Sequence, residues 1–392
     1  MKKIKDQIDL NKKKILLRLD LNVPLNDGKI TDTTRIEKII PTINFLLKNH
    51  SKIIILTHVG RPKGKIINNL SLKPVCENLK KKINIDIKLM LKNPSEINSS
   101  DLFVKPNERI IMFENIRFYS EEEQNDAVFA KHLASLADIY VNDAFSCSHR
   151  EHASIFEITK FIPSYCGLQM SEEINALNKV TLEIKKPVTC IVGGSKISTK
   201  INIIKNLMPK FDNMIIVGAM ANNIIEYKGY NIGKSLREKN CKEAIDEIFA
   251  ISKKSNCKII YPEDVAVGKN LNSNSKVKEL NNICKDELIL DIGPKTIKRI
   301  TDIINKTNTI LWNGPAGYFE NPNFAKGSFE IAKTIVEKNK LKSVYSVAGG
   351  GDTVAFLNNF GMSDSFNFVS TAGGAFLEYL EGKELPGIKA LN

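Results

Sequence analysis

The chain has 392 residues, of which 42% are hydrophobic and 26% are charged, and its formal net charge is +13. This composition is ordinary for a globular protein, and the length suits two domains better than one hydrophobic core. No apolar run approaches the roughly 18 residues of a membrane span, and Arg18 and Asp20 interrupt the apolar run after the basic opening, so no signal peptide is expected.

The positive charge is spread evenly along the chain. Residues 1–190 carry 30 Lys and Arg against 23 Asp and Glu, and the remaining residues carry 27 against 21. There is no basic tail or stripe, so a solvated lysine-rich surface is favoured over a nucleic-acid-binding face. The seven cysteines are scattered and form no CxxC pair. This pattern argues against disulfides and structural zinc and favours a reducing, cytoplasmic location.

Apolar runs alternate with amphipathic helical stretches along the whole chain. The candidate strands are residues 14–20, 52–58, 109–113 and 138–143 in the first half, and 187–192, 213–218, 257–262, 309–313, 343–349 and 366–370 in the second. One helix is predicted over 168–184, between the two series. Continuous apolar strands separated by helices indicate parallel sheets that are covered on both faces. The expected fold is therefore α/β, with two domains that each hold a parallel doubly wound (Rossmann-like) sheet.

Polar residues follow the predicted strands of the first half, at the sheet edge where open α/β sheets bind ligands. Asp20 and Asn22 come directly after the first strand. Arginine is rare in this lysine-using chain, and its rigid fork suits phosphate and carboxylate groups. His58 and four arginines lie in strand-exit loops or at a helix start: Arg35, Arg61, Arg117 and Arg150. One such arginine alone is more often paired with a surface carboxylate, but the group together predicts a site for an acidic small molecule.

Three glycine-containing loops follow strands of the second half. GGSKISTK (193–200) lacks the Walker spacing. On a helix, Lys196 and Lys200 would share a face, and a helix start favours an anion. Spacing alone therefore leaves a nucleotide site and a plain strand-to-helix turn equally good interpretations. WNGPAGYFE (312–320) is the second loop. GGGDT (349–353) adds Asp352, an oxygen ligand suited to Mg²⁺, and Thr353, which is expected to cap the next helix.

Eight motifs resemble those of the phosphoglycerate kinase family, in the family's order and spacing: RLDLNVPL, THVGRP, ENIRF, NDAFSCSHREHAS, GGSKISTK, WNGPAGYFE, GGGDT and STAGGAFLEYLEGKELPG. The resemblance covers nearly the whole chain. It implies reversible phosphoryl transfer between 1,3-bisphosphoglycerate with ADP and 3-phosphoglycerate with ATP, in glycolysis and gluconeogenesis. The transfer would be in line and would follow closure of the two domains about the long helix and a hinge at Ser370 and Thr371.

The resemblance also implies which residues act. The residues that would bind 3-phosphoglycerate are Asp20, Asn22, Arg35, His58, Arg61, Arg117 and Arg150. Those that would bind the nucleotide are Gly194, Ser195, Lys196, Lys200, Asn313, Pro315, Glu320, Gly350, Gly351, Asp352 and Thr353. The catalytic residues would be Arg35, Lys196 and the amides of Gly373 and Gly374, at the start of the last predicted helix. Asp352 would hold Mg²⁺ together with ATP or ADP.

The implied organisation has four parts. They are a 3-phosphoglycerate-binding domain over 1–167, an interdomain helix over 168–184, a nucleotide-binding domain over 185–370, and a C-terminal segment over 371–392 that returns to the first domain. A monomer is expected, with no nucleic acid or membrane required. Three departures from the usual family pattern are Phe368 for a histidine, Ala372 for a glycine, and Ser146-Cys147 for Gly-Thr.

The alternative interpretation is a non-catalytic nucleotide- or nucleic-acid-binding protein on the same fold. Loss of Arg35, Lys196 or Asp352 would favour it, and all three are present. A dinucleotide-dependent dehydrogenase is disfavoured because no GxGxxG follows the first strand.

The implied acceptor is a carboxylate, which is ionised at neutral pH and needs no general base. Asp20 is therefore expected to orient the substrate hydroxyl. The rate should stay flat between about pH 6.5 and 8.5, limited at the acid side by titration of His58 or of the substrate phosphate.

Overall fold

The computed structural model describes residues 1–6, 9–26 and 28–392, which divide into two compact units. Unit 1 comprises Met1–Ile174 and Glu384–Asn392, and unit 2 comprises Asn175–Lys383. The division falls within helix α5 (Leu168–Thr181), in the stretch that the sequence predicts as one helix. Within the described ranges, no helix combines the length and the apolar character that crossing a membrane requires.

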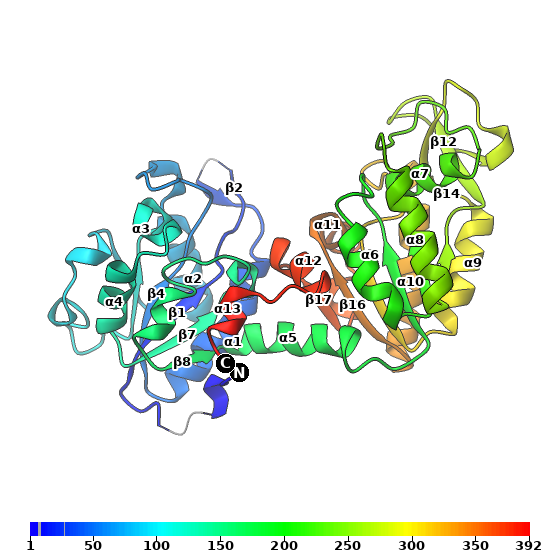
Figure 1. Ribbon diagram of the computed structural model, residues 1–392. Helices are drawn as coiled ribbons and strands as arrows, with labels where there is room; N and C mark the ends of the chain where they lie inside the picture. The colour runs from blue at the N-terminus through cyan, green and yellow to red at the C-terminus, as the bar shows by residue number, and fades with distance from the viewer. Residues whose placement is uncertain (7–8, 27) are drawn as a thin grey trace. The chain divides into compact units, whose positions relative to one another are not determined.

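Unit 1 is built on a six-stranded parallel sheet with the order β5-β6-β4-β1-β7-β8 (Figure 1). Its strands are β1 (Lys14–Leu19), β4 (Lys52–Leu56), β5 (Ile87–Met90), β6 (Ile110–Phe113), β7 (Ile139–Asp143) and β8 (Ser164–Cys166). Its helices, besides the first part of α5, are α1 (Thr34–Lys48), α2 (Lys73–Ile83), α3 (Ser120–Glu123), α4 (Ala127–Ser135) and α13 (Pro386–Lys389). A short antiparallel pair, β2 (Leu25–Asn26) and β3 (Lys29–Ile30), lies outside this sheet.

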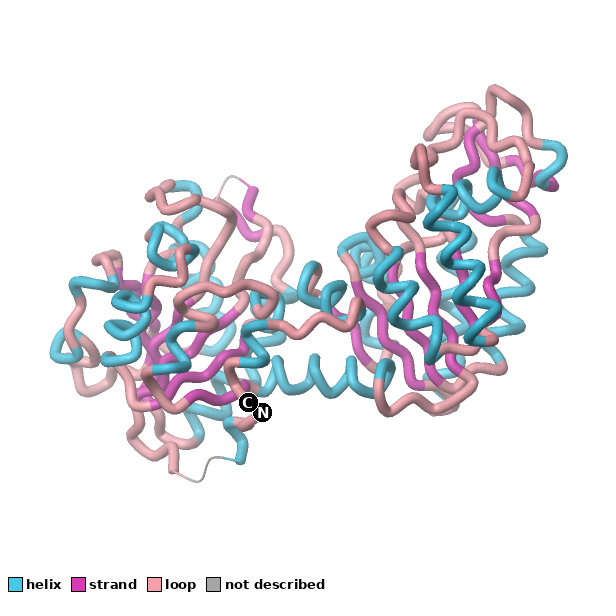
Figure 2. Tube along the Cα trace, viewed as in Figure 1, coloured by secondary structure: helices cyan, strands magenta, loops and turns pink. Residues whose placement is uncertain are grey.

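The central strands of unit 1 are mostly apolar, and both faces of the sheet are buried. Successive side chains of a strand point to opposite faces. Leu17 and Ile55 accordingly pack in the core that includes residues of α1 and α2, whereas Leu16 and Ile54 pack in the core that includes residues of α4. Figure 2 shows helices on both sides of this sheet. The predicted doubly wound α/β fold is confirmed.

Unit 2 repeats this architecture with a parallel sheet of order β11-β10-β9-β15-β16-β17. The strands are β9 (Val188–Val192), β10 (Asn213–Ile216), β11 (Lys258–Ile260), β15 (Thr309–Asn313), β16 (Tyr345–Gly349) and β17 (Phe368–Ser370). The helices are α6 (Ile201–Leu207), α7 (Ala219–Tyr227), α8 (Lys242–Ser255), α9 (Pro294–Asn305), α10 (Lys326–Lys340), α11 (Gly351–Asn359) and α12 (Gly374–Leu380). Trp312, which is completely buried, is the largest side chain of the core that includes residues of α9, α10 and α11.

Unit 2 also contains a three-stranded antiparallel sheet that the sequence analysis did not predict. Its order is β13-β12-β14, with strands β12 (Asp264–Gly268), β13 (Lys276–Glu279) and β14 (Leu288–Ile292). The strands have four or five residues, and β13 is mostly exposed, so it lacks a continuous apolar run. The edge strands β5 and β8 were missed for the same reason, because each is short and only partly buried.

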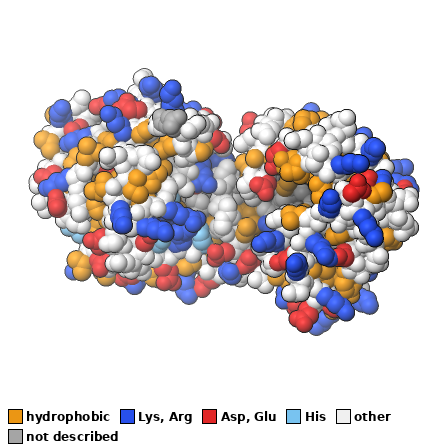
Figure 3. All heavy atoms as spheres, turned by 90° about the horizontal axis from the view of Figure 1, so that it is seen from above, with side chains coloured by type: hydrophobic (Ala, Val, Ile, Leu, Met, Phe, Trp, Pro, Cys, Tyr) orange, Lys and Arg blue, Asp and Glu red, His pale blue; other side chains and the backbone are white. Residues whose placement is uncertain are grey.

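The two ends of the chain both belong to unit 1, where Lys2 N donates to Leu391 O at 3.3 Å (Figure 1). Helix α12 begins at Gly374 as expected, but it is not the last helix, because α13 follows it. Gly387 of α13 donates to Ser148 O at 2.8 Å, which ties the final segment to the loop after β7. Figure 3 shows Lys and Arg side chains mixed with Asp and Glu over the visible face of each unit.

Candidate active site

The carboxylate of Asp20, in the loop after β1, contacts both the start of α1 and the segment after β7. All three lie at the edge of the unit 1 sheet where its parallel strands end. Arg35, in the first turn of α1, places Nη1 2.7 Å from Oδ2 and 3.0 Å from Oδ1 of Asp20. Ser146, from the loop after β7, donates its hydroxyl to Oδ2 at 2.5 Å. Asp20 is only 9% exposed, so this ion pair is shielded from solvent. The structure thus brings together Asp20 and Arg35, as the sequence predicted.

Asn22 connects the loop after β1 to the loop after β4. Its Oδ1 accepts from Gly60 N at 2.9 Å, and Gly60 O in turn accepts from Arg117 Nη1 at 3.0 Å. Gly60 has φ of +66°, and a Cβ there would lie 2.9 Å from the Leu70 side chain, so the turn requires glycine. Arg61, the next residue, is exposed. Asn22, Arg61 and Arg117 therefore lie in loops that hydrogen bonds join at one edge of the unit 1 sheet.

Arg18 contacts one of the predicted substrate-binding residues, His58, although the sequence analysis did not select Arg18. It lies inside β1 and is completely buried. Its Nη2 is 3.2 Å from His58 Nδ1, and its Nε donates to Ser154 Oγ at 2.9 Å. The signal that could have found it is an arginine within an apolar strand of a chain that otherwise relies on lysine.

Burial and the neighbouring arginines hold the pKa of His58 well below its ordinary value. Burial contributes most, followed by the positive charges of Arg18, Arg117 and Arg35. The lowered pKa favours the neutral form of the His58 ring in the folded protein. The assignment of the acid limit of the rate to His58 or to the substrate phosphate stays a prediction.

Buried carboxylates balance part of the positive charge. Glu122 is completely buried and accepts from Ser154 N at 2.9 Å and Ser154 Oγ at 2.7 Å. Burial opposes its ionisation, but His152 and Arg18 lower the pKa of Glu122 overall. Arg117 is 3% exposed, and burial lowers the pKa of its guanidinium.

Arg150 is half-buried and donates from Nε to His149 Nε2 at 3.2 Å. Like Ser146, it lies in the segment that follows β7. All seven residues predicted to bind the acidic substrate thus lie after the carboxyl ends of β1, β4, β6 and β7 or, for Arg35, at the start of α1. An edge with so many guanidinium forks can hold an anion with several oxygens.

In unit 2, the glycine loop after β9 does not have the helical conformation that the sequence analysis assumed. Helix α6 begins only at Ile201, with Lys200 at its N-cap, so Lys196 and Lys200 do not share a helix face. The backbone N–H and the hydroxyl of Ser198 both donate to Glu238, which lies outside the loop. Lys196 is exposed, and Lys200 is half-buried.

Hydrogen bonds join the three predicted nucleotide loops. Lys200 Nζ donates to Asn313 Oδ1 at 2.5 Å, and Asn313 Nδ2 donates to Gly349 O at 2.6 Å. Burial lowers the pKa of Lys200, and the charge of Asp352 opposes this shift. Thr353 does not cap a helix as predicted, because α11 already starts at Gly351. Its hydroxyl instead accepts from Gly314 N at 2.7 Å.

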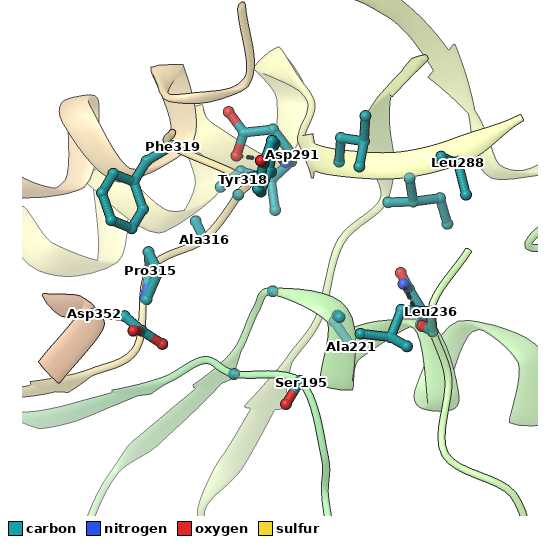
Figure 4. A pocket seen from close by; sticks show the side chains of 18 of the residues that line it. Ser195, Ala221, Leu236, Leu288, Asp291, Pro315, Ala316, Tyr318, Phe319 and Asp352 are labelled. Carbon is teal, nitrogen blue, oxygen red and sulfur yellow. Dashed lines mark hydrogen bonds between the residues drawn. The ribbon is translucent and has the colours of Figure 1, made fainter. Parts of the chain in front are cut away.

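A pocket of about 290 Å³ opens beside these loops (Figure 4). Five predicted nucleotide-binding residues line it: Gly194, Ser195, Pro315, Glu320 and Asp352. In Figure 4, Ser195, Pro315 and Asp352 lie at one side of the pocket, whereas Leu236 and Leu288 lie at the other. The described lining does not include Lys196, Lys200, Asn313, Gly350, Gly351 or Thr353.

The apolar walls of this pocket were predicted only in part. Tyr318 and Phe319 belong to the predicted loop 312–320, but Leu236 and Leu288 lie in no motif, and Leu288 comes from the antiparallel sheet that the sequence did not reveal. Nothing in the local sequence distinguishes such residues from ordinary core positions. The pocket combines a polar side near the glycine loops with an apolar side, which suits a ligand that has a charged end and a flat apolar end.

Gly373 and Gly374 form the start of α12. Gly373 is the N-cap residue with φ of +59°, and Gly374 is exposed. Neither belongs to the described lining of the pocket. Their place at a helix start makes their amides available to an anion, but their predicted catalytic role stays a prediction.

Asp352 is the residue that fits a divalent cation. Its side chain is exposed, lines the pocket and lies in the first turn of α11. Across the described residues, no group of three or more His, Cys, Asp or Glu could hold a metal ion. Mg²⁺ that is carried by a nucleotide needs no such group, because one or two carboxylates and the phosphates suffice.

Comparison with known proteins gives full-length matches. A model of the family "Phosphoglycerate kinase" matches residues 4–383. The phosphoglycerate kinase of Wolbachia pipientis wMel is 45% identical over 388 residues, which is 98% of this chain and 97% of the relative. That of Orientia tsutsugamushi (strain Ikeda) is 44% identical over 383 residues, or 97% and 94% of the two chains. The solved phosphoglycerate kinase from Coxiella burnetii has a TM-score of 0.90 at 36% identity and covers 99% of this chain and 98% of its own.

Proposed function

The chain belongs to the phosphoglycerate kinase family, and on this premise we propose that unit 1 binds 3-phosphoglycerate and that unit 2 binds ADP or ATP. The activity of the chain is phosphoryl transfer between 1,3-bisphosphoglycerate with ADP and 3-phosphoglycerate with ATP, a step of glycolysis. The residues that perform it are the subject of the proposal.

The main support for placing 3-phosphoglycerate on unit 1 is the group of polar and charged side chains around Asp20, which hydrogen bonds and ion pairs connect. Arg35 and Asp20 form an ion pair at 2.7 Å, while Asn22 and Arg117 are joined through Gly60. The forks of Arg61, Arg117 and Arg150 supply donors for a phosphate, and neutral His58 adds a hydrogen-bonding ring without further charge. Asp20 and Asn22 supply acceptors for the substrate hydroxyl.

The pocket in unit 2 supports the nucleotide assignment. Its apolar side, with Leu236 and Leu288, suits the adenine ring. Its polar side adjoins the glycine loops, where backbone amides and Lys200 would meet the phosphates. Glu320, which is exposed and lines the pocket, would accept hydrogen bonds from the ribose.

Catalysis then consists of positioning and charge stabilisation. The acceptor carboxylate of 3-phosphoglycerate is ionised at neutral pH, so no residue has to remove a proton from it. Arg35, Lys196 and the amides of Gly373 and Gly374 would stabilise the charge of the transferring group. Asp352 would hold Mg²⁺, which supplies charge neutralisation on the nucleotide phosphates. The expected domain closure, monomeric state and cytoplasmic location stay predictions.

ATP formation from ADP and 1,3-bisphosphoglycerate tests the proposal. The purified protein should produce ATP, and Lys200→Ala should raise the Michaelis constant for ADP while leaving that for 1,3-bisphosphoglycerate within about twofold. A change confined to 1,3-bisphosphoglycerate would refute the placement of the nucleotide on unit 2. A protein that binds nucleotide without forming ATP would instead support the non-catalytic alternative.

A further inference from the structure

Glu238 makes a two-point contact with the glycine loop of unit 2, and the proposed function gives it no role. The backbone N–H of Ser198 donates to Oε2 of Glu238 at 2.9 Å, and the hydroxyl of Ser198 donates to Oε1 at 2.5 Å. Ser198 lies in the segment 193–200, between Lys196 and Lys200. One carboxylate thus satisfies two donors of a loop whose own backbone hydrogen bond here, from Lys200 N to Ile197 O at 3.0 Å, closes a single turn before α6.

Glu238 is itself anchored to helix α7. Asn223, which is 2% exposed, donates from Nδ2 to Glu238 O at 2.7 Å, and its Oδ1 accepts from Glu238 N at 3.3 Å. The same helix holds the other end of the loop, because Met220 N donates to Gly194 O at 2.8 Å. Helix α7 therefore fixes the loop both at Gly194 and, through Glu238, at Ser198.

The electrostatics place Lys196 near this carboxylate. The hydrogen bonds from Ser198 contribute most to lowering the pKa of Glu238, and the positive charge of Lys196 contributes further. Lys196 is exposed and lies two residues before Ser198, so the conformation of Ser198 decides where the Lys196 side chain can reach.

We propose that Glu238 is a positioning residue for phosphoryl transfer, which fixes the 193–200 loop through Ser198 and so presents Lys196 to the transferring group. The inference rests on the proposed function for its catalytic consequence, but the fixing of the loop is a property of the ligand-free protein. The two can therefore be measured separately.

Three variants separate the effect of fixing the loop from the effect of the negative charge of Glu238. Glu238→Ala removes both acceptors. Glu238→Gln keeps the shape, since its oxygen can accept from Ser198 N while its amide donates to the hydroxyl oxygen. Glu226→Ala is the matched control, because Glu226 forms an ion pair with Arg237, the residue before Glu238, and has no contact with Ser198.

Hydrogen exchange of the ligand-free protein measures the fixing of the loop. Glu238→Ala should speed exchange of the 195–200 amides by about tenfold, the factor that loss of about one charge-assisted hydrogen bond allows. Glu238→Gln and Glu226→Ala should stay within about threefold of the parent. Unchanged exchange in Glu238→Ala would overturn the proposal.

Steady-state kinetics measure the consequence. Glu238→Ala should lower kcat by about tenfold while the Michaelis constant for 3-phosphoglycerate stays within about twofold, and Glu238→Gln should restore kcat. If Glu238→Ala does not fold, Ser198→Ala, which removes only the hydroxyl donor, should give the same changes at a smaller size. Faster exchange with unchanged kcat would overturn the positioning role, whereas absence of activity in the parent protein would refute the proposed function and leave the exchange result standing.

Discussion

The candidate sites of the two units offer a ligand different kinds of contact. In unit 1, the cluster around Asp20 consists of charged side chains that are largely buried and paired with one another, such as Arg35 with Asp20. In unit 2, the site consists of glycine loops, one half-buried lysine and an apolar pocket of about 290 Å³. The first relies on side-chain charge, and the second relies on backbone shape.

This difference predicts where each site is vulnerable. A site made of guanidinium groups should lose much of its binding or activity when one arginine side chain is removed, because the remaining arginines cannot take its place. A site made of backbone amides tolerates side-chain changes but not changes of backbone conformation. The predictions below test this contrast, in order of decreasing effect.

Removing the Arg35 fork should have the largest effect. Arg35→Ala should lower kcat by about 10²–10³, the loss of about 3–4 kcal/mol typical of a donor that acts on the transition state. The Michaelis constant for 3-phosphoglycerate should rise less. Arg299→Ala, which removes an exposed arginine paired with Glu263, is the control and should be neutral. Near-normal turnover in Arg35→Ala would remove Arg35 from catalysis.

Gly350→Ala, which adds a single methyl group, should strain the backbone of a nucleotide loop of unit 2 and weaken the binding of ADP. Gly350 has φ of +96°, and a Cβ there would lie 2.4 Å from Asn313 Nδ2, the side chain that holds Lys200. Backbone strain of about 1–3 kcal/mol would raise the Michaelis constant for ADP by about 5- to 150-fold. Gly361→Ala is a matched control, because Gly361 also has a positive φ (+63°), its Cβ would meet nothing within 4 Å, and it is not one of the predicted nucleotide-binding residues. Equal effects in the two variants would show that backbone shape is not what matters here.

The depressed pKa of His58 makes the stability of unit 1 depend on pH. The unfolded chain binds a proton at His58 below about pH 6.5, whereas the folded chain does not. The free energy of unfolding should therefore be fully retained above that pH and fall as the pH drops, by up to about 1.4 kcal/mol per pH unit. His58→Gln should flatten this slope in urea unfolding at pH 7 and pH 5.5. An unchanged slope would show that the pKa of His58 is the same in the folded and the unfolded protein.

Ser146 should matter least, because it is a neutral donor to a carboxylate that Arg35 already holds. Ser146→Ala removes the 2.5 Å hydrogen bond to Asp20. We expect the Michaelis constant for 3-phosphoglycerate to rise by no more than about fivefold, the equivalent of about 1 kcal/mol, with kcat unchanged. An effect as large as that of Arg35→Ala would contradict the view that charge dominates recognition in unit 1.

The sequence predicted much of the fold because both parallel sheets consist of buried, continuously apolar strands. It failed for β12, β13 and β14. Strands β13 and β14 are partly exposed, and β12 is buried but has only five residues, with Asp264 at one end and Gly268 at the other; the three strands pair with one another. The polar residues of unit 1 were predictable because arginine is rare in this chain and the ends of parallel strands meet at one edge. Arg18 carries a signal of the same kind, an arginine within an apolar strand, but was not selected. Glu122 was not predictable, because its role depends on burial.

In unit 2, the sequence identified the glycine loops but not their conformation. Lys196 and Lys200 were expected on one helix face, but helix α6 begins only at Ile201, and Ser198 between the two lysines donates to Glu238. Glu238 lies 40 residues further along the chain, and its partner could not be inferred from local sequence. The pocket walls, such as Leu236 and Leu288, come from segments with no motif at all.

Competition by sulfate tests the contrast between the two sites most directly. A multivalent anion should satisfy several forks of Arg61, Arg117 and Arg150 at once. Sulfate at millimolar concentrations should therefore compete with 3-phosphoglycerate but not with ATP, and sodium chloride at equal ionic strength should not reproduce the effect. Inhibition that is competitive only with the nucleotide would contradict the assignment of the arginine cluster to the acidic substrate.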